Sequence, residues 1–371
     1  MIQSQLAKHL REQKSRLQNL SVITGFDGFV DELISVVGQR HSLSDYQRIE
    51  TIDKFGEVIR AAAGHSSLRE IVVNNVDPGG CAVNLGDGLA EFGIPVSTYA
   101  TVGEPIHSAF NNYAQKAQLV SWGDSPGKTL AFEFADGKLM FSSVSQLQEF
   151  TPEKLSLCLK DGAFFENCSK ASLFAITNWS LFPHMTACWE YLLEVVFSKL
   201  VHKPRIFFDL VDPSSRSVED IQKMLGALSQ FSQCCHVTLG LNQNETNVLS
   251  RLTNGTHTQA KTPEEALIQA CELKSNIGIE SVIVHSLRYA VGCDGSNTAL
   301  AWGPFCENPK KSTGAGDRFN AGYILGSLIE CSLEDKLMLA TASAGYFVRT
   351  AKSASIENLA SFIEETSFMR G

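Results

Sequence analysis

Short apolar runs alternate with segments of helical period from residue 172 to residue 286, and this alternation limits the possible folds most strongly. The apolar runs are "SLFAIT" (172–177), "RIFFDL" (205–210), "HVTLGL" (236–241) and "SVIVHS" (281–286). Between them, helices are predicted near 184–199, 218–230, 244–252 and 263–277. Strands joined by helices pair in parallel and are covered on both faces. The sequence therefore predicts an α/β fold with a mostly parallel central sheet.

The first half of the chain departs from this order. An amphipathic helix at 3–20 precedes a first strand at Ser21–Thr24, and further strands are expected at 70–73 and 96–103. The stretch "KTLAFEFADGKLMFSS" (128–143) alternates apolar and polar residues on both sides of a turn, which predicts a β-hairpin. A helical segment near 53–63, a short strand at 298–302 and two final helices, 315–330 and 333–349, complete the expected elements. We expect the hairpin and the N-terminal insert to form a small lid at one edge of the fold.

Composition excludes several classes of function. The net charge is −9, which argues against a nucleic-acid surface or a polybasic membrane anchor. The N-terminus is too polar for a signal peptide, and no stretch approaches the roughly 20 apolar residues of a membrane span. The ten cysteines show no CxxC spacing and are typical of buried thiols in a reducing compartment. We expect a cytoplasmic protein without nucleic-acid or membrane partners.

The stretch "STGAGDRF" (312–319) combines small residues with a carboxylate at a helix start. Gly314, Ala315 and Gly316 let backbone N–H groups approach a ligand, and the helix adds its positive end, so an anion fits here. Asp317 would repel a phosphate, but it can accept a proton from the group that attacks one. The alternative is an ordinary helix start, capped by Ser312 or Thr313.

A second glycine turn opens another helix in "DPGGCAVNLGDG" (77–88), with Gly79 and Gly80 followed by Asn84. Both motifs in this order resemble the signatures of the ribokinase-like (PfkB-type) carbohydrate kinase family. The resemblance implies a three-layer fold over a single domain, 1–371, with a β-lid at about 27–38 and 124–145. It also implies an anion hole before a catalytic Asp317, a sugar site at Gly79, Gly80 and Asn84, and the use of ATP and Mg²⁺.

A third motif, "LNQNETNVL" (241–249), resembles the family's Asn-x-x-Glu pattern, which organises magnesium through its waters. Asn242 and Glu245 are then the residues for Mg²⁺ and the phosphates; otherwise they simply start a helix. The segment that follows the last apolar run matches the family's nucleotide-binding region and brings His285, Ser286 and Gly292 near ATP. A single histidine at a strand end is also common as a structural residue.

Two pairs of residues stay open. The family holds sugar hydroxyls with an aspartate after the first strand, and both Asp27 and Asp31 qualify; Asp31 is favoured because Leu33 and Ile34 continue as a lid strand. In "FFDLVDPSSRS" (207–217), Asp209 and Arg216 either line the phosphate-transfer region or form an Asp-Pro turn with a capping arginine.

Two residues depart from the family pattern. Lys311 stands where relatives carry an aspartate that helps to hold a monovalent cation. Its ammonium could replace that cation beside ATP, which predicts turnover without added K⁺, or it could face solvent. Arg318 stands where a small residue is usual, and lies either on the helix surface or within reach of a phosphate.

The sequence thus predicts ATP-dependent phosphorylation of a sugar or sugar-phosphate hydroxyl, with a possible homodimer through the lid. A nucleoside kinase is the first alternative, since one fold serves several substrates; Phe132 and Phe134 would then stack on a base instead of filling the lid core. A non-catalytic sensor is the second. A nicotinamide oxidoreductase is disfavoured because "GDGLAEFG" (86–93) lies inside a helix pattern, not at a strand-to-helix turn.

Overall fold

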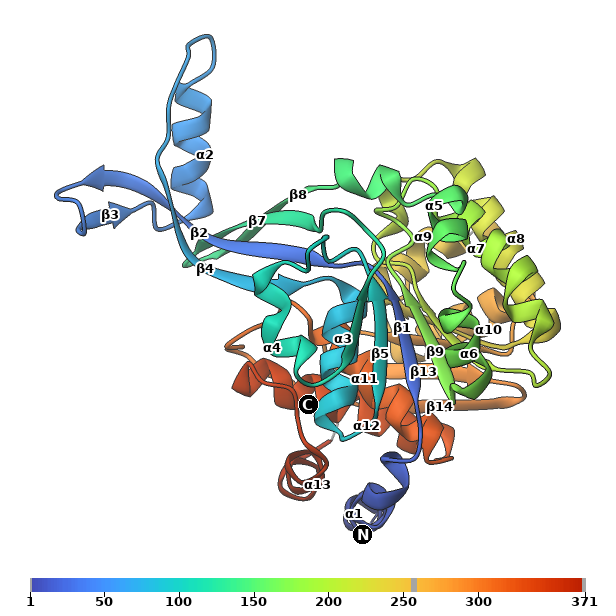
Figure 1. Ribbon diagram of the computed structural model, residues 1–371. Helices are drawn as coiled ribbons and strands as arrows, with labels where there is room; N and C mark the ends of the chain where they lie inside the picture. Colours follow the sequence, from blue (N-terminus) through green and yellow to red (C-terminus); the bar gives the residue numbers. More distant parts are fainter. Residues whose placement is uncertain (1, 255–258, 369–371) are drawn as a thin grey trace.

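The computed structural model describes residues 2–254 and 259–368, and within them a nine-stranded sheet forms the centre of the molecule (Figure 1). From one edge to the other its strands are β14 (Asn297–Trp302), β13 (Tyr289–Asp294), β12 (Ser281–His285), β11 (His236–Asn242), β10 (Arg205–Asp209), β9 (Leu173–Thr177), β1 (Val22–Phe26), β5 (Val96–Ala100) and β6 (Gln118–Ser121). In this sheet order, the seven strands from β12 to β6 pair in parallel. Strands β13 and β14 pair antiparallel at one edge.

Helices cover both faces of this sheet. One face carries α1 (Ile2–Leu17), α3 (Cys81–Glu91), α11 (Ala315–Leu328), α12 (Leu333–Thr350) and α13 (Ile356–Glu365). The other carries α5 (Pro152–Cys158), α6 (Ala163–Lys170), α7 (Met185–Val195), α8 (Val218–Cys234), α9 (Gln243–Asn254) and α10 (Pro263–Ile277). A short helix, α4 (Asn111–Ala114), packs at the β5–β6 edge. The predicted three-layer α/β fold is confirmed.

Strand β10 shows why the central strands are continuous apolar runs. Phe207 points to one face, where its ring packs 6.0 Å from that of Tyr323 in α11. The next residue, Phe208, points to the other face and packs 4.7 Å from Trp189 in α7. All four side chains are buried, and each contributes about 1.5–3 kcal/mol relative to exposure. Because both faces are covered, no polar alternation is left in such strands.

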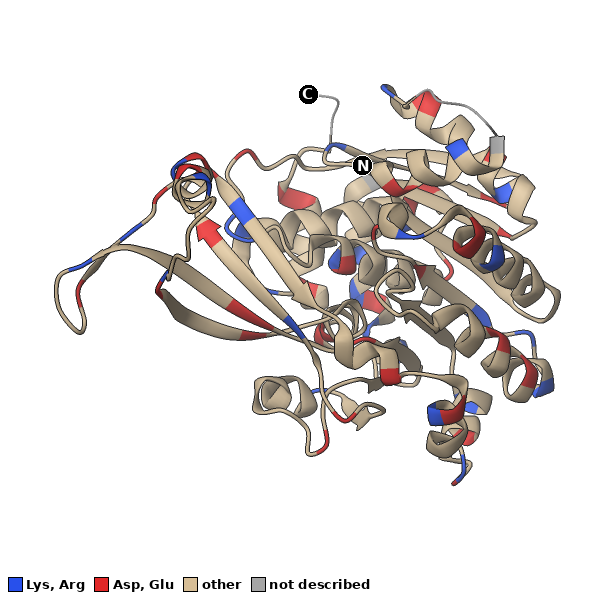
Figure 2. Cartoon of the chain, turned by 90° about the horizontal axis from the view of Figure 1, so that it is seen from above, with Lys and Arg blue, Asp and Glu red and all other residues tan. Residues whose placement is uncertain are grey.

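A second, five-stranded sheet projects from the side of the body (Figures 1 and 2). Its strands are β2 (Phe29–Arg40), β3 (Tyr46–Arg48), β4 (Ile71–Gly79), β7 (Gly127–Phe134) and β8 (Gly137–Ser143), and α2 (Ile52–Ala61) packs against it. Phe55 of α2 stacks 6.0 Å from Phe132 and 5.4 Å from Phe134. Phe132 and Phe134 therefore lie in the core between this small sheet and α2.

The structure corrects several element boundaries. The predicted strand at 70–73 is the start of β4, which continues to Gly79 because its backbone pairs with β2 through Phe29–Gly79. The final helix pair is followed by α13, which packs against α1 and α12. Short 3₁₀ turns lie at Ser108–Phe110, Ser145–Glu149, Phe197–Lys199 and Pro213–Ser215. The predicted 1–371 domain includes residues 1, 255–258 and 369–371, which lie outside the described residues.

Candidate active site

The loop before α11 has the form of an anion site. Gly314 is the N-cap of α11 with φ +88°, a left-handed conformation that favours glycine. The N–H groups of the first turn of α11 have no intrahelical acceptor, and the helix dipole adds positive charge there. A Cβ on Gly314 would lie 3.7 Å from Asn84 Nδ2, so the two glycine motifs of the sequence meet at this point.

Asp317 lies in the first turn of α11 and is 7% exposed. Burial, and then the charge of the neighbouring Asp209, raise the pKa of this carboxyl to about 8, while Arg318 opposes the shift. Burial, and then the charge of Asp317, raise the pKa of the Cys81 thiol at the start of α3, so the two side chains are neighbours. A carboxylate with a raised pKa and an anion site beside it is suited to accept a proton during phosphoryl transfer.

Asp209 ends β10 and faces the same centre. Its Oδ1 accepts from the backbone N–H of Val211 at 2.9 Å, and its Oδ2 accepts from Asn320 Nδ2 of α11 at 2.5 Å. Val211 has φ +61°, so a β-branched residue is held in a strained, left-handed conformation. Burial raises the pKa of Asp209 to about 6. Asn320 Oδ1 is buried and has no hydrogen-bond partner among the described atoms.

Asn242 and Glu245 form a reciprocal pair at the start of α9. Glu245 Oε2 accepts from the Asn242 N–H at 2.8 Å and Oε1 from Asn242 Nδ2 at 2.6 Å, while the Glu245 N–H donates to Asn242 Oδ1 at 2.9 Å. Burial, and then the charge of Asp209, raise the pKa of Glu245 to about 8. Three carboxyls with raised pKa values, the buried Asp317 and Glu245 and the partly buried Asp209, therefore gather where β10, α9 and α11 meet.

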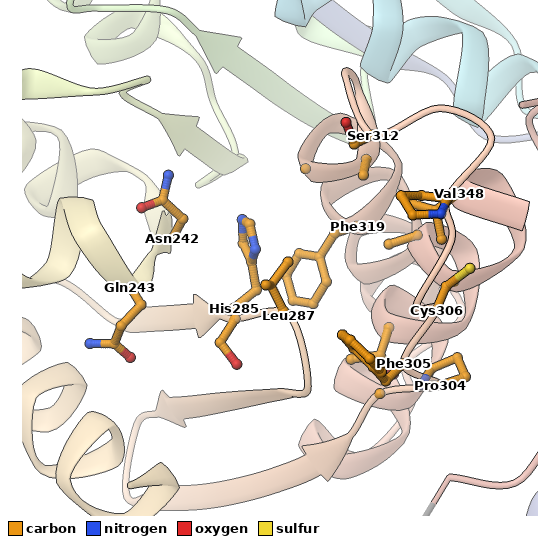
Figure 3. A pocket seen from close by; sticks show the side chains of 18 of the residues that line it. Asn242, Gln243, His285, Leu287, Pro304, Phe305, Cys306, Ser312, Phe319 and Val348 are labelled. Carbon is orange, nitrogen blue, oxygen red and sulfur yellow. The ribbon is translucent and has the colours of Figure 1, made fainter. Parts of the chain in front are cut away.

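A cavity of about 470 Å³ opens between α9, the end of β12, the first turns of α11 and the C-terminal half of α12 (Figure 3). His285 stands in its middle, 4.7 Å from the ring of Phe319, and burial lowers the pKa of His285 to about 4. The imidazole is therefore neutral at pH 7. The other labelled walls are Asn242 and Gln243 on one side and Pro304, Phe305, Cys306 and Val348 on the other. A mostly apolar cavity beside an anion loop suits a flat aromatic base attached to phosphates.

Asp27 follows β1 and is fully buried. Its Oδ2 accepts from the Cys81 N–H at 2.7 Å and from Asn178 Nδ2 at 2.9 Å. Its Oδ1 accepts from the Ala82 N–H at 2.9 Å and from Thr177 Oγ1 at 2.8 Å. Four donors thus saturate the carboxylate, which caps the N-terminus of α3 and leaves little capacity for a sugar hydroxyl.

Asp31 lies on β2 of the small sheet, where a Cβ on Gly79 would come within 2.5 Å of its Oδ2. Its neighbour on β7 is Thr129, and burial raises the pKa of the Asp31 carboxyl. Next to it, Lys311 Nζ bonds Asp77 Oδ2 of β4 at 3.2 Å. Asp31 therefore borders the glycine turn with spare acceptor capacity, unlike Asp27.

Comparison with known proteins identifies the family. Residues 2–366 match the family model described as prokaryotic ketohexokinase. The chain belongs to the prokaryotic ketohexokinase family. A curated ketohexokinase from Haloferax volcanii is 26% identical over 350 residues, which cover 94% of this chain and 92% of the relative. Members of this family are phosphotransferases that act on a sugar hydroxyl, so the predicted carbohydrate-kinase class is confirmed.

Solved structures show the fold that this ketohexokinase-family chain shares with other kinases. Ribokinase from Thermotoga maritima superimposes with a TM-score of 0.61 at 17% identity, covering 93% of this chain and 99% of that one. A nucleoside kinase from Methanocaldococcus jannaschii superimposes with a TM-score of 0.57 at 13% identity, covering 93% and 98%. The ribokinase-like fold is thereby confirmed.

Other residues named from the sequence lie elsewhere than expected. Gly292 is in β13, where a Cβ would contact Ile283, Leu333 and Leu337, so it occupies a core position and does not line the cavity at His285. Lys311 does not line that cavity either, because Asp77 holds its ammonium at the small sheet. Ser286 does line the cavity.

Arg216 does not line the cavity at His285 either. Its guanidinium stacks 4.4 Å from the Trp179 ring and donates to the carbonyls of Ser180, Phe182 and Pro183. It therefore ties down the 180–183 turn. Asp209, the other residue of that motif, does reach the site.

Sequence reasoning missed three contributors to the site: Cys81, Asn320 and Asp87. Cys81 and Asn320 lie inside the two recognised motifs, so their helical positions could have indicated them. Asp87 bonds Arg318 across 231 residues of sequence, and nothing local points to that pairing. Arg318 itself is buried and does not lie on the helix surface.

Proposed function

We propose that this protein is an ATP- and Mg²⁺-dependent kinase that phosphorylates a hydroxyl group of a ketohexose. The observation that carries this proposal is the position of Asp317: a buried carboxyl in the first turn of α11, between the cavity at His285 and the glycine turn at Gly80. Membership in the ketohexokinase family supports the ketohexose as substrate.

Each part of the reaction is assigned to particular residues of the chain. The cavity around His285 and Phe319 takes the adenine base, and the N–H groups of Ala315 to Asp317 receive the phosphoryl group as its charge develops. Asp31 and Gly79 hold the sugar, and the small sheet covers it as a lid. Asp317 accepts the proton of the attacking hydroxyl.

The acidic cluster fits a hydrated magnesium ion. In the described ranges, no three His, Cys, Asp or Glu side chains are arranged to ligate a metal directly. Mg²⁺ keeps several waters, and Glu245 and Asn242 would hold those waters. The three carboxyls with raised pKa values and the unpaired Asn320 Oδ1 are oxygen groups of the kind this ion attracts. When bound, the ion neutralises charge on the phosphates.

The alternatives have less support. A nucleoside kinase would use Phe132 and Phe134 as a platform for the base, but both pack against Phe55 of α2. A sensor without turnover would not need a buried base beside an anion loop. The homodimer through the lid stays a prediction; the exposed Val73, Val76, Met140 and Phe141 lie on its strands.

In the described part of the chain, no helix is long and apolar enough to cross a membrane.

The test is ADP release from MgATP with a panel of ketohexoses, aldohexoses, sugar phosphates and nucleosides. We expect the largest kcat/KM with a ketohexose, and loss of the signal in Asp317→Asn. A preference for nucleosides, or full activity in Asp317→Asn, would contradict the proposal. Nucleotide binding measured by calorimetry shows that the variant is folded.

A further inference from the structure

Arg318 is a buried cation held from three sides. Its side chain leaves the first turn of α11, and the residue is 7% exposed. Nε donates to Ser353 Oγ at 3.1 Å, and Nη2 donates to Asp87 Oδ2 of α3 at 3.0 Å. Ser353 Oγ donates to the same Asp87 oxygen at 2.7 Å, and the guanidinium carbon lies 4.6 Å from the Phe347 ring. Such a network fixes the orientation of the guanidinium.

The remaining nitrogen of Arg318 faces the anion loop. Nη1 lies 3.0 Å from the point that a Cβ on Gly314 would occupy. No acceptor in the described part of the chain bonds to Nη1. The guanidinium therefore fills the space that the missing side chain of Gly314 leaves, and presents a positive charge to this loop. His285 contacts the same loop at Gly316, where its Nε2 lies 3.7 Å from the corresponding point.

A solvent-filled cavity of about 430 Å³ lies behind the loop on the Arg318 side. Its charged walls are the cations Lys116, Lys311, Arg318 and Lys352 and the carboxylates Asp87 and Glu91. Cations thus outnumber carboxylates behind the anion loop. Lys311 is drawn to Asp77, and Lys116 bonds Asp87 Oδ1 at 3.0 Å, so Arg318 is the cation of this set that the structure places against Gly314.

We propose that Arg318 is a positioning residue for phosphoryl transfer. Its guanidinium holds the Gly314–Gly316 loop in its anion-binding form and supplies a permanent positive charge there, so that turnover requires no added monovalent cation. The inference rests on the proposed kinase function. It assigns to Arg318 the electrostatic role that the sequence alone suggested for Lys311.

The first experiment compares the kinetics of the wild-type protein and Arg318→Ala. We expect kcat to fall about 10- to 100-fold, somewhat less than the loss of a direct anion-hole donor, with the KM for the sugar changed less than about threefold. Guanidinium chloride, well below denaturing concentration, should restore part of kcat, because the vacated space adjoins the 430 Å³ cavity. Arg318→Lys keeps the charge without the fork and should retain intermediate activity.

The matched control is Lys116→Met, which removes a cation from the same Asp87 carboxylate without touching Gly314. We expect its kcat to equal that of the wild type. Wild-type rates should also be equal in the chlorides of K⁺, Na⁺ and tetramethylammonium at one ionic strength. Strong K⁺ activation of the wild type would overturn the inference. So would an Arg318→Ala protein that unfolds at a lower temperature but keeps its kcat.

A binding measurement separates this inference from the proposed function. Calorimetry with inorganic phosphate should show at least tenfold weaker binding to Arg318→Ala than to the wild type. Equal phosphate affinities would refute the role of Arg318, whether or not the protein phosphorylates a sugar. Absence of ADP release from the wild type with every sugar would refute the proposed function alone.

Discussion

Asp27→Asn should lower stability much more than a surface substitution, because four donors converge on the Asp27 carboxylate. The amide that replaces it keeps one oxygen and therefore about half of these bonds. Its NH₂ group faces two donors on the other side. Losing two hydrogen bonds to a buried charge costs about 3–6 kcal/mol. For 371 residues the unfolding entropy is about 0.8 kcal/mol per kelvin near the midpoint, so the midpoint should fall by about 4–8 °C.

The comparison variant is Asp31→Asn. Because burial raises the pKa of Asp31, ionisation of this carboxyl costs more in the folded protein than in the unfolded chain, and a neutral amide should leave the unfolding midpoint unchanged or slightly higher. Its effect should appear in kinetics. Weakening one charge-assisted bond to a sugar hydroxyl should lower kcat/KM for the sugar about 10- to 100-fold.

Differential scanning fluorimetry and initial rates at varied sugar concentration measure both effects. The reasoning would be refuted if Asp27→Asn melted with the wild type while Asp31→Asn lost several degrees and kept its KM. That result would exchange the structural and substrate-binding roles of the two aspartates.

Three further predictions use other parts of the structure. Gly314→Ala places a side chain at φ +88° and 3.0 Å from Arg318 Nη1, so kcat should fall about 100-fold and the free energy of unfolding by about 1–2 kcal/mol. Initial rates and melting curves would show whether the loop tolerates the added methyl group. Arg216→Met removes the clamp on the 180–183 turn and should cost about 2–4 kcal/mol of stability with unchanged kcat and KM, so a large kinetic loss would return Arg216 to the active site. With a folded-state pKa of about 8, Asp317 holds a proton that the unfolded chain releases near pH 4, so its contribution to stability is lost as the pH rises toward 8. Melting curves of the free protein between pH 4 and pH 8 should therefore show a smaller decline of the unfolding midpoint for Asp317→Asn than for the wild type.

Local patterns predicted the elements that repeat a regular period. The runs at 172–177, 205–210, 236–241 and 281–286 became β9 to β12, because strands covered on both faces are uniformly apolar. Strand β4 was largely missed, since "NNVDPGG" reads as a turn by composition. Its residues are extended because β2 supplies hydrogen-bond partners along its length. Edge pairing of this kind depends on tertiary context and not on propensity.

The residues of the site likewise fall into those that local sequence patterns predicted and those that they did not. Asp317 and the loop before it follow from one contiguous motif, and the geometry of a helix N-terminus explains their chemistry. Whether Asp27 or Asp31 was saturated depended on Thr177 and Asn178, about 150 residues away. The burial of Arg318 depended on Asp87 and Ser353, which a one-dimensional pattern does not connect.

The left-handed conformation of Val211, next to Asp209, lowers thermal stability but supports the catalytic rate. A β-branched residue at φ +61° costs about 1–2 kcal/mol, which glycine or asparagine at this position would recover in part. Selection for thermal endurance alone would favour such a replacement. The backbone N–H that bonds Asp209 remains after such a replacement, but glycine lets this segment adopt other conformations as well and so would loosen the carboxylate that faces Asp317 and Glu245. Directed evolution for higher thermal stability should therefore select substitutions of Val211 early, and these substitutions should lower kcat.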